Sequence, residues 1–109
     1  MLYDKQRWDK SPALKPWQQI LLDMADLIER KGWGTGGVWT TDRHTKERHD
    51  FCVVGAALNV NGSPLNKFRA LRELRRHVDT GIISWNDQKA YWRGGRPYVV
   101  RTLRDAAGR

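Results

Sequence analysis

The sequence has a single cysteine, Cys52, and no run of about 18 apolar residues. One cysteine cannot form a disulfide within the chain, and this is typical of proteins from reducing compartments. The first ten residues also lack the apolar stretch of a secretory signal peptide. We therefore expect a cytoplasmic protein that has no membrane partner.

The chain of 109 residues and 12.7 kDa is long enough for one domain. Its six tryptophans can each bury a large area, so the core can be adequate despite 29% charged residues. Residues 1–12 are mostly polar, and we interpret them as an N-terminal arm. Residues 13–109 are expected to form a single helical domain.

The excess positive charge lies in the C-terminal part of the chain. Residues 63–109 contain eleven Lys or Arg and four Asp or Glu, which gives +7 of the total net charge of +8. This asymmetry favours an anionic partner for that half. A solvated surface that keeps a small protein soluble is the alternative explanation.

Apolar periodicity, together with proline and glycine positions, predicts a mainly α fold of about four helices. Pro16 is suited to a first helical position and Gly32 to a helix stop. Ser63 can cap the third helix, whose apolar stripe is expected to be buried: Leu65, Phe68, Leu71, Leu74 and Val78. The predicted helices span residues 16–31, 51–60, 64–78 and 97–107.

The connection at 32–50 contains four glycines in its first six residues, which excludes a helix there. Residues 38–41 have strand-like composition, so a short β-hairpin is one interpretation of this segment. Asp50 is expected to cap the helix at 51–60. That helix is apolar nearly all round, which predicts a position in the middle of the domain.

Four motifs in this order resemble a family of small uncharacterised proteins from actinobacteria and their phages. The first helix ends in Leu-Ile-Glu-Arg-Lys-Gly-Trp at 27–33, and Cys-x-x-Gly-Ala follows at 52–56. Trp-Asn-Asp stands at 85–87, and the last helix ends in Leu-Arg-Asp-Ala-Ala at 103–107. The similarity covers roughly residues 14–107, and it implies a fold and a phage-related setting but no chemistry.

Cys52 and His49 are the only candidate nucleophile and base, with Asn86 or Asp87 to orient the histidine. The apolar neighbours of Cys52 favour a buried structural thiol instead. His44, His49, Cys52 and His77 match no common zinc spacing. We therefore predict no catalytic residue, no metal site and no cofactor, and we do not expect an enzyme.

Trp-Asn-Asp is expected to be structural, with Trp85 in the core, Asn86 in a tight turn and Asp87 capping a short helix. The alternative is that Asn86 and Asp87 line a ligand pocket.

Arginines and aromatic rings alternate in the C-terminal half. Arginine neutralises phosphates, and exposed rings can stack on unpaired bases. The hypothesis is therefore that the protein binds nucleic acid, with single-stranded character, through this surface. A host protein bound through the same Trp/Tyr/Arg segment is the alternative, and a cysteine-dependent enzyme is a weaker one. The candidate binding residues are Arg69, Arg72, Arg76, Tyr91, Trp92, Arg93 and Arg96.

Overall fold

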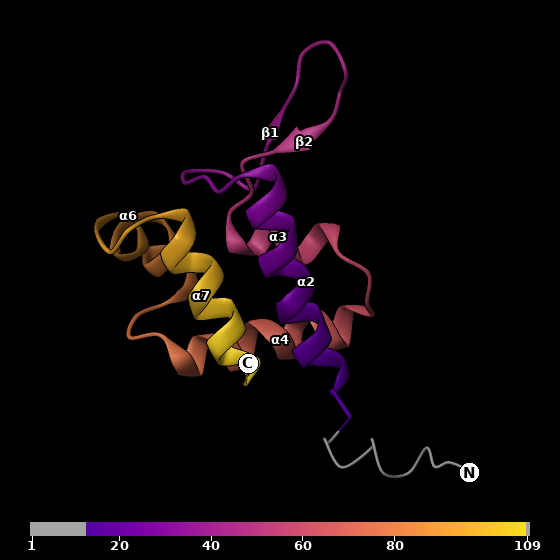
Figure 1. Ribbon diagram of the computed structural model, residues 1–109, viewed down its shortest axis with the longest axis vertical. Coiled ribbons are helices and arrows are strands. Elements are labelled where there is room, and N and C mark those ends of the chain that lie inside the picture. Colours follow the sequence, from indigo (N-terminus) through magenta and orange to yellow (C-terminus); the bar gives the residue numbers. More distant parts are fainter. Residues whose placement is uncertain (1–12, 109) are drawn as a thin grey trace, which may run out of the picture.

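Helix α2 (Pro16–Lys31) lies at the centre of the fold in the computed structural model, which describes residues 13–108 (Figure 1). The predicted arm at 1–12 lies outside the described residues. Pro16 occupies the first turn, and Gly32 ends the helix with a φ of 102° while its N–H donates to the Ile28 carbonyl. The prediction of a helix at 16–31 is confirmed, and its apolar side is fully buried: Ile20, Leu21, Met24, Ala25 and Ile28.

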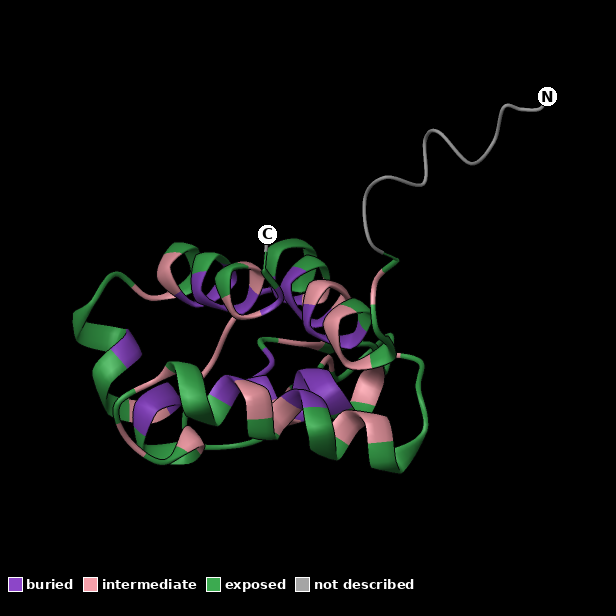
Figure 2. Cartoon of the chain, turned by 90° about the horizontal axis from the view of Figure 1, so that it is seen from below, coloured by how far each residue is buried: buried purple, intermediate pink, exposed green. Residues whose placement is uncertain are grey.

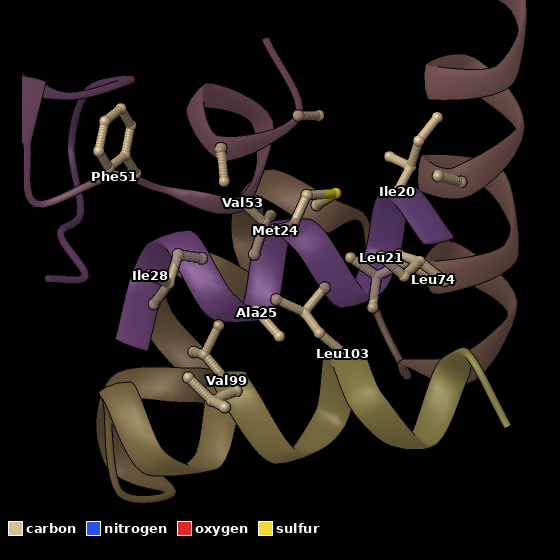
Figure 3. Packing of buried hydrophobic residues seen from close by; sticks show 14 of the residues in the cluster. Ile20, Leu21, Met24, Ala25, Ile28, Phe51, Val53, Leu74, Val99 and Leu103 are labelled. Atoms are coloured by element: carbon tan, nitrogen blue, oxygen red, sulfur yellow. The ribbon is translucent and has the colours of Figure 1, made fainter. Parts of the chain in front are cut away.

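Three other helices pack against α2. They are α7 (Arg96–Ala106), α4 (Pro64–His77) and α3 (Val53–Asn59). α7 runs alongside α2 in the opposite direction (Figure 1), and Gln18 donates a hydrogen bond of 3.0 Å to the Ala107 carbonyl. Val99 and Leu103 of α7 and Leu74 of α4 meet the apolar side of α2 (Figure 3). The buried segments of the helices face one another and the exposed segments form the outside (Figure 2).

The described residues form five helices rather than the predicted four. The additional helix is continuous over 82–92 and consists of α5 (Ile82–Ser84), η1 (Trp85–Lys89) and α6 (Ala90–Trp92). In η1 the Ala90 N–H donates to the Trp85 carbonyl, five residues back. This π turn lets Trp85 and Ala90, five residues apart, both be fully buried. The apolar spacing of an ordinary helix is absent here, which is why the periodicity did not predict it.

Two short strands follow α2 and form the hairpin that residues 38–41 suggested. β1 (Thr40–Thr41) pairs antiparallel with β2 (Arg48–His49). The Asp42 carboxylate accepts hydrogen bonds from the backbone N–H groups of Thr45 and His44, and these bonds lower the pKa of Asp42. The hairpin extends away from the helices beyond the end of α2 (Figure 1).

Asp50 does not cap α3, and the prediction that this helix begins at Phe51 is wrong. Phe51 forms a parallel bridge with Trp33, and the Asp50 N–H donates to the Lys31 carbonyl, so this stretch is extended. The helix begins two residues later, at Val53. Cys52 caps it, since its Sγ accepts from the Gly55 N–H at 3.3 Å.

The buried stripe predicted for α4 is wrong at two positions. Leu74 is buried and Leu71 half-buried, but Leu65 is 75% exposed and Phe68 is 64% exposed. Ala70, which was not part of the predicted stripe, is buried in the core instead. Ala70 lies on the side of α4 that is buried in the core, whereas Leu65 and Phe68 lie on sides of the same helix that are exposed to solvent.

Gly55 allows α3 to lie directly against the backbone of Val38. A Cβ at position 55 would overlap the Val38 carbonyl oxygen and stand 2.6 Å from its carbonyl carbon. The same approach allows the Cys52 N–H to donate to the Val38 carbonyl at 3.1 Å. The packing of α3 on the glycine-rich connection therefore requires a residue without a side chain here.

We predict that Gly55→Ala lowers the free energy of unfolding by about 1–3 kcal/mol, because the backbone must shift to relieve the overlap. Urea denaturation measures this. Gly37→Ala is the matched control, since a Cβ there meets no atom within 4 Å. Equal stability of the two variants would contradict the close approach.

Candidate functional site

The candidate arginines of α4 lie on its solvent side. Arg69, Arg72 and Arg76 are all exposed, as their helical spacing predicted. Arg76 reaches the Glu73 carboxylate at 3.5 Å, whereas Arg69 and Arg72 form no ion pair within residues 13–108. The two exposed apolar residues Leu65 and Phe68 belong to the same helix, so this surface is both basic and apolar.

Tyr91 and Trp92 form an exposed aromatic pair on α6. Their ring centroids are 5.4 Å apart and their planes are nearly perpendicular, at 85°. Trp92 is 82% exposed and Tyr91 is 62% exposed. An edge-to-face pair is a favourable arrangement, and both rings of this pair are exposed to solvent.

Arg93 is already engaged by neighbours within the fold. Its guanidinium donates to the Asp79 carboxylate at 2.9 Å and to the Tyr98 hydroxyl at 3.3 Å. The hydrogen bond from Arg93 lowers the pKa of Asp79, and that to Asp79 raises the pKa of Arg93. This contact joins the chain just after α4 to the end of α6. Arg93 is therefore a structural link as well as a candidate binding residue.

Arg96 is exposed at the start of α7, beside a hollow of about 440 Å³. The hollow is also lined by Arg101, Arg104 and Glu29. Arg104 is held by the carboxylates of Glu29 at 2.9 Å and Asp26 at 3.1 Å, and it lowers the pKa of Glu29. Of these arginines, Arg96 and Arg101 form no ion pair within the described part of the chain.

The candidate residues are thus distributed over α4, α6 and the start of α7. Tyr91, Trp92 and Arg93 are consecutive in the chain, and Arg96 follows at the start of α7; among them the structure shows the contact between the Tyr91 and Trp92 rings. The α4 arginines belong to another helix, and the Arg93–Asp79 contact is the nearest described link between the two groups. Lys89, exposed in the turn before Tyr91, is a further cation that the sequence pattern did not single out.

Asn86 is buried inside the helix at 82–92, and the prediction of a tight turn at this position is wrong. Its Oδ1 accepts from the Trp33 Nε1–H at 2.9 Å and from the Val53 N–H at 3.1 Å. Its Nδ2 donates to the Gly34 carbonyl and to Asp87 Oδ1. One amide therefore joins the glycine-rich connection, the start of α3 and η1, and three of the motifs that carried the resemblance meet here.

A hollow of about 260 Å³ lies beside this amide and is lined by both Asn86 and Asp87. Its other walls are mostly apolar and include Val38, Val54 and Ile83. Asp87 Oδ1 also accepts from the Gly36 N–H at 3.3 Å. The two side chains thus both support the fold and line a pocket, so the two interpretations of Trp-Asn-Asp are not exclusive. Trp85 is fully buried, as predicted.

Cys52 lines the same hollow, but its described partners do not form a nucleophilic site. The thiol is buried and accepts from the Gly55 N–H. His49 Nδ1 lies 3.1 Å from the Asp50 carboxylate, and the four partners of Asn86 do not include His49. The described hydrogen bonds therefore do not link Cys52, His49 and Asn86 into a nucleophilic site.

Within residues 13–108, no three His, Cys, Asp or Glu side chains are grouped as a metal site would require. No helix in that part of the chain combines the length and apolar character needed to cross a membrane.

We predict that Asn86→Ala lowers the free energy of unfolding by about 3 kcal/mol, because it leaves several buried polar groups without partners. Gln88→Ala is the matched control, since Gln88 is an exposed amide two residues away. Chemical denaturation of both variants measures the difference. A loss for Asn86→Ala no larger than that of the control would show that the amide does not hold these segments together.

Comparison with known proteins gives a family. Residues 12–109 match the Family of unknown function (DUF6197). The chain matches no curated protein and no solved structure. The match agrees with the resemblance to an uncharacterised family. The protein belongs to this family of unknown function.

Proposed function

We propose that the protein is a small basic accessory protein that binds nucleic acid with single-stranded character. The proposed binding surface consists of Tyr91 and Trp92 of α6, together with Lys89, Arg93 and Arg96, which lie within four residues of them along the chain. A phage-related setting, implied by the sequence resemblance, is part of the proposal. The observation that carries it is the aromatic pair that the fold leaves in the solvent.

The rings supply the part of the interaction that recognises bases. Trp92 is 82% exposed, so burying it against a ligand removes a large apolar area from water. Stacking of a base on an aromatic side chain contributes about 1–3 kcal/mol and tolerates any base. Single strands present such unpaired faces, whereas the bases of a duplex are stacked on one another. We therefore expect the rings to bind a single strand in preference to a duplex.

The cations supply attraction for phosphates. Lys89 and Arg96 are exposed within four residues of the rings, and the Arg93 side chain stays 41% exposed despite its contact with Asp79. Arg69, Arg72 and Arg76 of α4 contribute at longer range, since attraction between charges extends over about 10 Å at 0.1 M salt. The net charge of +7 in residues 63–109 gives such a surface fast, salt-dependent association.

Recognition of a host protein through the same rings is the second candidate. Tryptophan, tyrosine and arginine dominate the energetics of protein interfaces, and Trp92, Tyr91 and Arg93 are consecutive here. The two candidates differ in salt dependence, because counterion release from phosphates gives a steep loss of affinity with salt.

We predict that Trp92→Ala weakens binding of a fluorescein-labelled 15-residue oligodeoxynucleotide about tenfold, because the variant cannot stack one base on the indole ring. Fluorescence anisotropy at low salt measures the affinity. Trp92→Phe should retain most of it, because a ring remains. Phe68→Ala removes an exposed ring from α4 and should have little effect. If the Phe68 and Trp92 variants behave alike, the aromatic pair is not the binding site.

We also predict that Lys89→Glu with Arg96→Glu abolishes most of the oligonucleotide affinity. The slope of log K against log salt should fall by about one for each phosphate that the variant no longer neutralises. Arg43→Glu with Lys46→Glu at the hairpin tip changes the net charge equally and is the control. Equal losses in both double variants would indicate attraction by total charge alone, without a site at α6.

A further inference from the structure

Helix α3 is apolar on nearly every side, yet the fold covers only part of it. Val53, Ala56 and Ala57 are buried, whereas Leu58 is 58% exposed. The sequence predicted a position in the middle of the domain, and that prediction is wrong for the side of Leu58. A solvent-facing apolar side on a helix without a polar face indicates a surface that another molecule covers.

The uncovered side of α3 forms a groove with α4. The groove has a volume of about 320 Å³, and its walls are apolar except for Lys67. Leu58 stands on one side and Phe68, 64% exposed, on the other. The remaining walls are Val54 and Ala57 of α3 and Pro64 and Leu71 of α4.

The apolar surface continues beyond the groove. Val54 also lines the hollow of about 260 Å³, together with Val38 and Ile83. Ile83 is itself 67% exposed. Apolar side chains therefore extend from α4 across α3 to Ile83, at the start of the helix over 82–92, whereas the Tyr91–Trp92 pair lies at the other end of that helix.

The α4 side of the groove is basic. Arg72 and Arg75 follow Phe68 and Leu71 by four residues, so each is a neighbour of a groove residue along the helix. Both are exposed, and neither forms an ion pair within the described chain. Lys67 reaches from α4 to the Leu58 carbonyl at 3.4 Å, where its ammonium spans the groove. At the far end, Asp87 is the single acid among the lining residues of both hollows.

The positive charge beside the groove favours one class of binding partner over the others. A second copy would bring the same positive patch to the interface and no carboxylates among the residues that line the groove to pair with it, and like charges that meet across an interface are costly. Nucleic acid would satisfy the arginines but has no aliphatic surface to fill the space between Leu58 and Phe68. A helix with apolar residues at i, i+3 or i+4, and i+7, flanked by carboxylates, satisfies both features. Such anchors span about 10 Å, the length of the seven-residue α3.

We propose that the groove between α3 and α4 binds an acidic amphipathic helix of a partner protein. The partner's apolar residues occupy the space between Leu58 and Phe68, and its carboxylates pair with Arg72 and Arg75. Arg72 also contributes charge to the proposed nucleic-acid site, but the apolar groups of the two surfaces differ: Leu58 and Phe68 border the groove, and Trp92 lies on α6. Variants of these apolar residues therefore disable each surface without the other.

Binding of synthetic peptides to the full chain tests the proposal. The probe is a labelled 16-residue helix with leucines at i, i+4, i+7 and i+11 and glutamates beside them. One control peptide replaces the glutamates by lysine, and another replaces the leucines by glutamine. We expect the acidic peptide to bind at least tenfold more tightly than either control, measured by fluorescence anisotropy in 0.15 M salt.

Variants of the chain identify the surface. Leu58→Ser with Phe68→Ser should lose at least tenfold in affinity for the acidic peptide, and both residues are exposed enough for the fold to survive. Tyr91→Ser is the matched control and should bind the peptide normally. Arg72→Glu with Arg75→Glu should reverse the preference, so that the lysine peptide becomes the tighter ligand. Circular dichroism confirms that each variant is folded.

Three outcomes would overturn the proposal. The first is equal or undetectable binding of the acidic and lysine peptides. The second is self-association in sedimentation equilibrium that Leu58→Ser with Phe68→Ser abolishes, because the groove would then join two copies. The third is oligonucleotide binding that depends on Leu58 and Phe68 but not on Trp92. Only the third would also remove the proposed function at α6.

Discussion

The side-chain amide of Asn86 joins three parts of the fold: the glycine-rich connection, the start of α3 and the helix at 82–92. It accepts from Trp33 at the end of the first motif and from the first N–H of α3, and it donates to the Gly34 carbonyl. An amide can do this because it offers donors and acceptors in fixed positions about 2 Å apart, as neither a carboxylate nor an alkyl side chain does. Because the Asn86 side chain is buried, these bonds form in surroundings of lower dielectric constant than water, which strengthens them. The short helix α3 and the glycine-rich connection therefore depend on the helix at 82–92 for their positions.

The position of a long helix with regular apolar spacing was predictable from the sequence. The degree to which a helix side is covered, an irregular turn within a helix and the exact start of a short helix were not. Residues 16–31 have apolar side chains at helical spacing, a proline at the start and a glycine after the end, and the helix has those bounds. In α4 the spacing was equally clear, but periodicity gives the side of a helix that is apolar without saying how much of it the rest of the chain can cover. Ala70 faces the core, so Leu65 and Phe68 cannot. The sequence did not predict that Trp85 and Ala90 belong to one helix, because residues five apart do not share a side of an ordinary α-helix. The π turn between them allows both to be buried. The cap of α3 was misplaced because Asp50 is a better capping residue by composition, while the bridge between Trp33 and Phe51 keeps that stretch extended.

The sequence predicted the residues of the candidate site, and the structure shows which of these side chains already form contacts within the fold. Sequence alone cannot separate Arg93, bound to Asp79, from Arg96, which has no ion pair in the described chain, since both are arginines in the same basic segment. Exposure of Trp92 was likewise undetermined, because a tryptophan among glycines and arginines is as compatible with a core anchor as with a surface ring. Trp85, seven residues earlier, is fully buried. The difference is set by the turn of the helix at 82–92, which faces Trp85 and Ala90 inward and therefore directs Tyr91 and Trp92 outward.

Net charge alone does not distinguish between the two proposed partners, and the proposals differ in the apolar groups that stand beside the charge. Arginines on α4 and cations around α6 attract any polyanion, whether it carries phosphates or carboxylates. The rings of Tyr91 and Trp92 are flat and stand in the solvent, so they match the faces of bases. Leu58 and Phe68 instead border a groove with mostly apolar walls, which is suited to aliphatic side chains. We therefore propose two chemical classes of partner for two surfaces with the same sign of charge, because their apolar parts differ in shape. For a small basic domain, the geometry of exposed apolar side chains is therefore more informative about the partner than the number of positive charges.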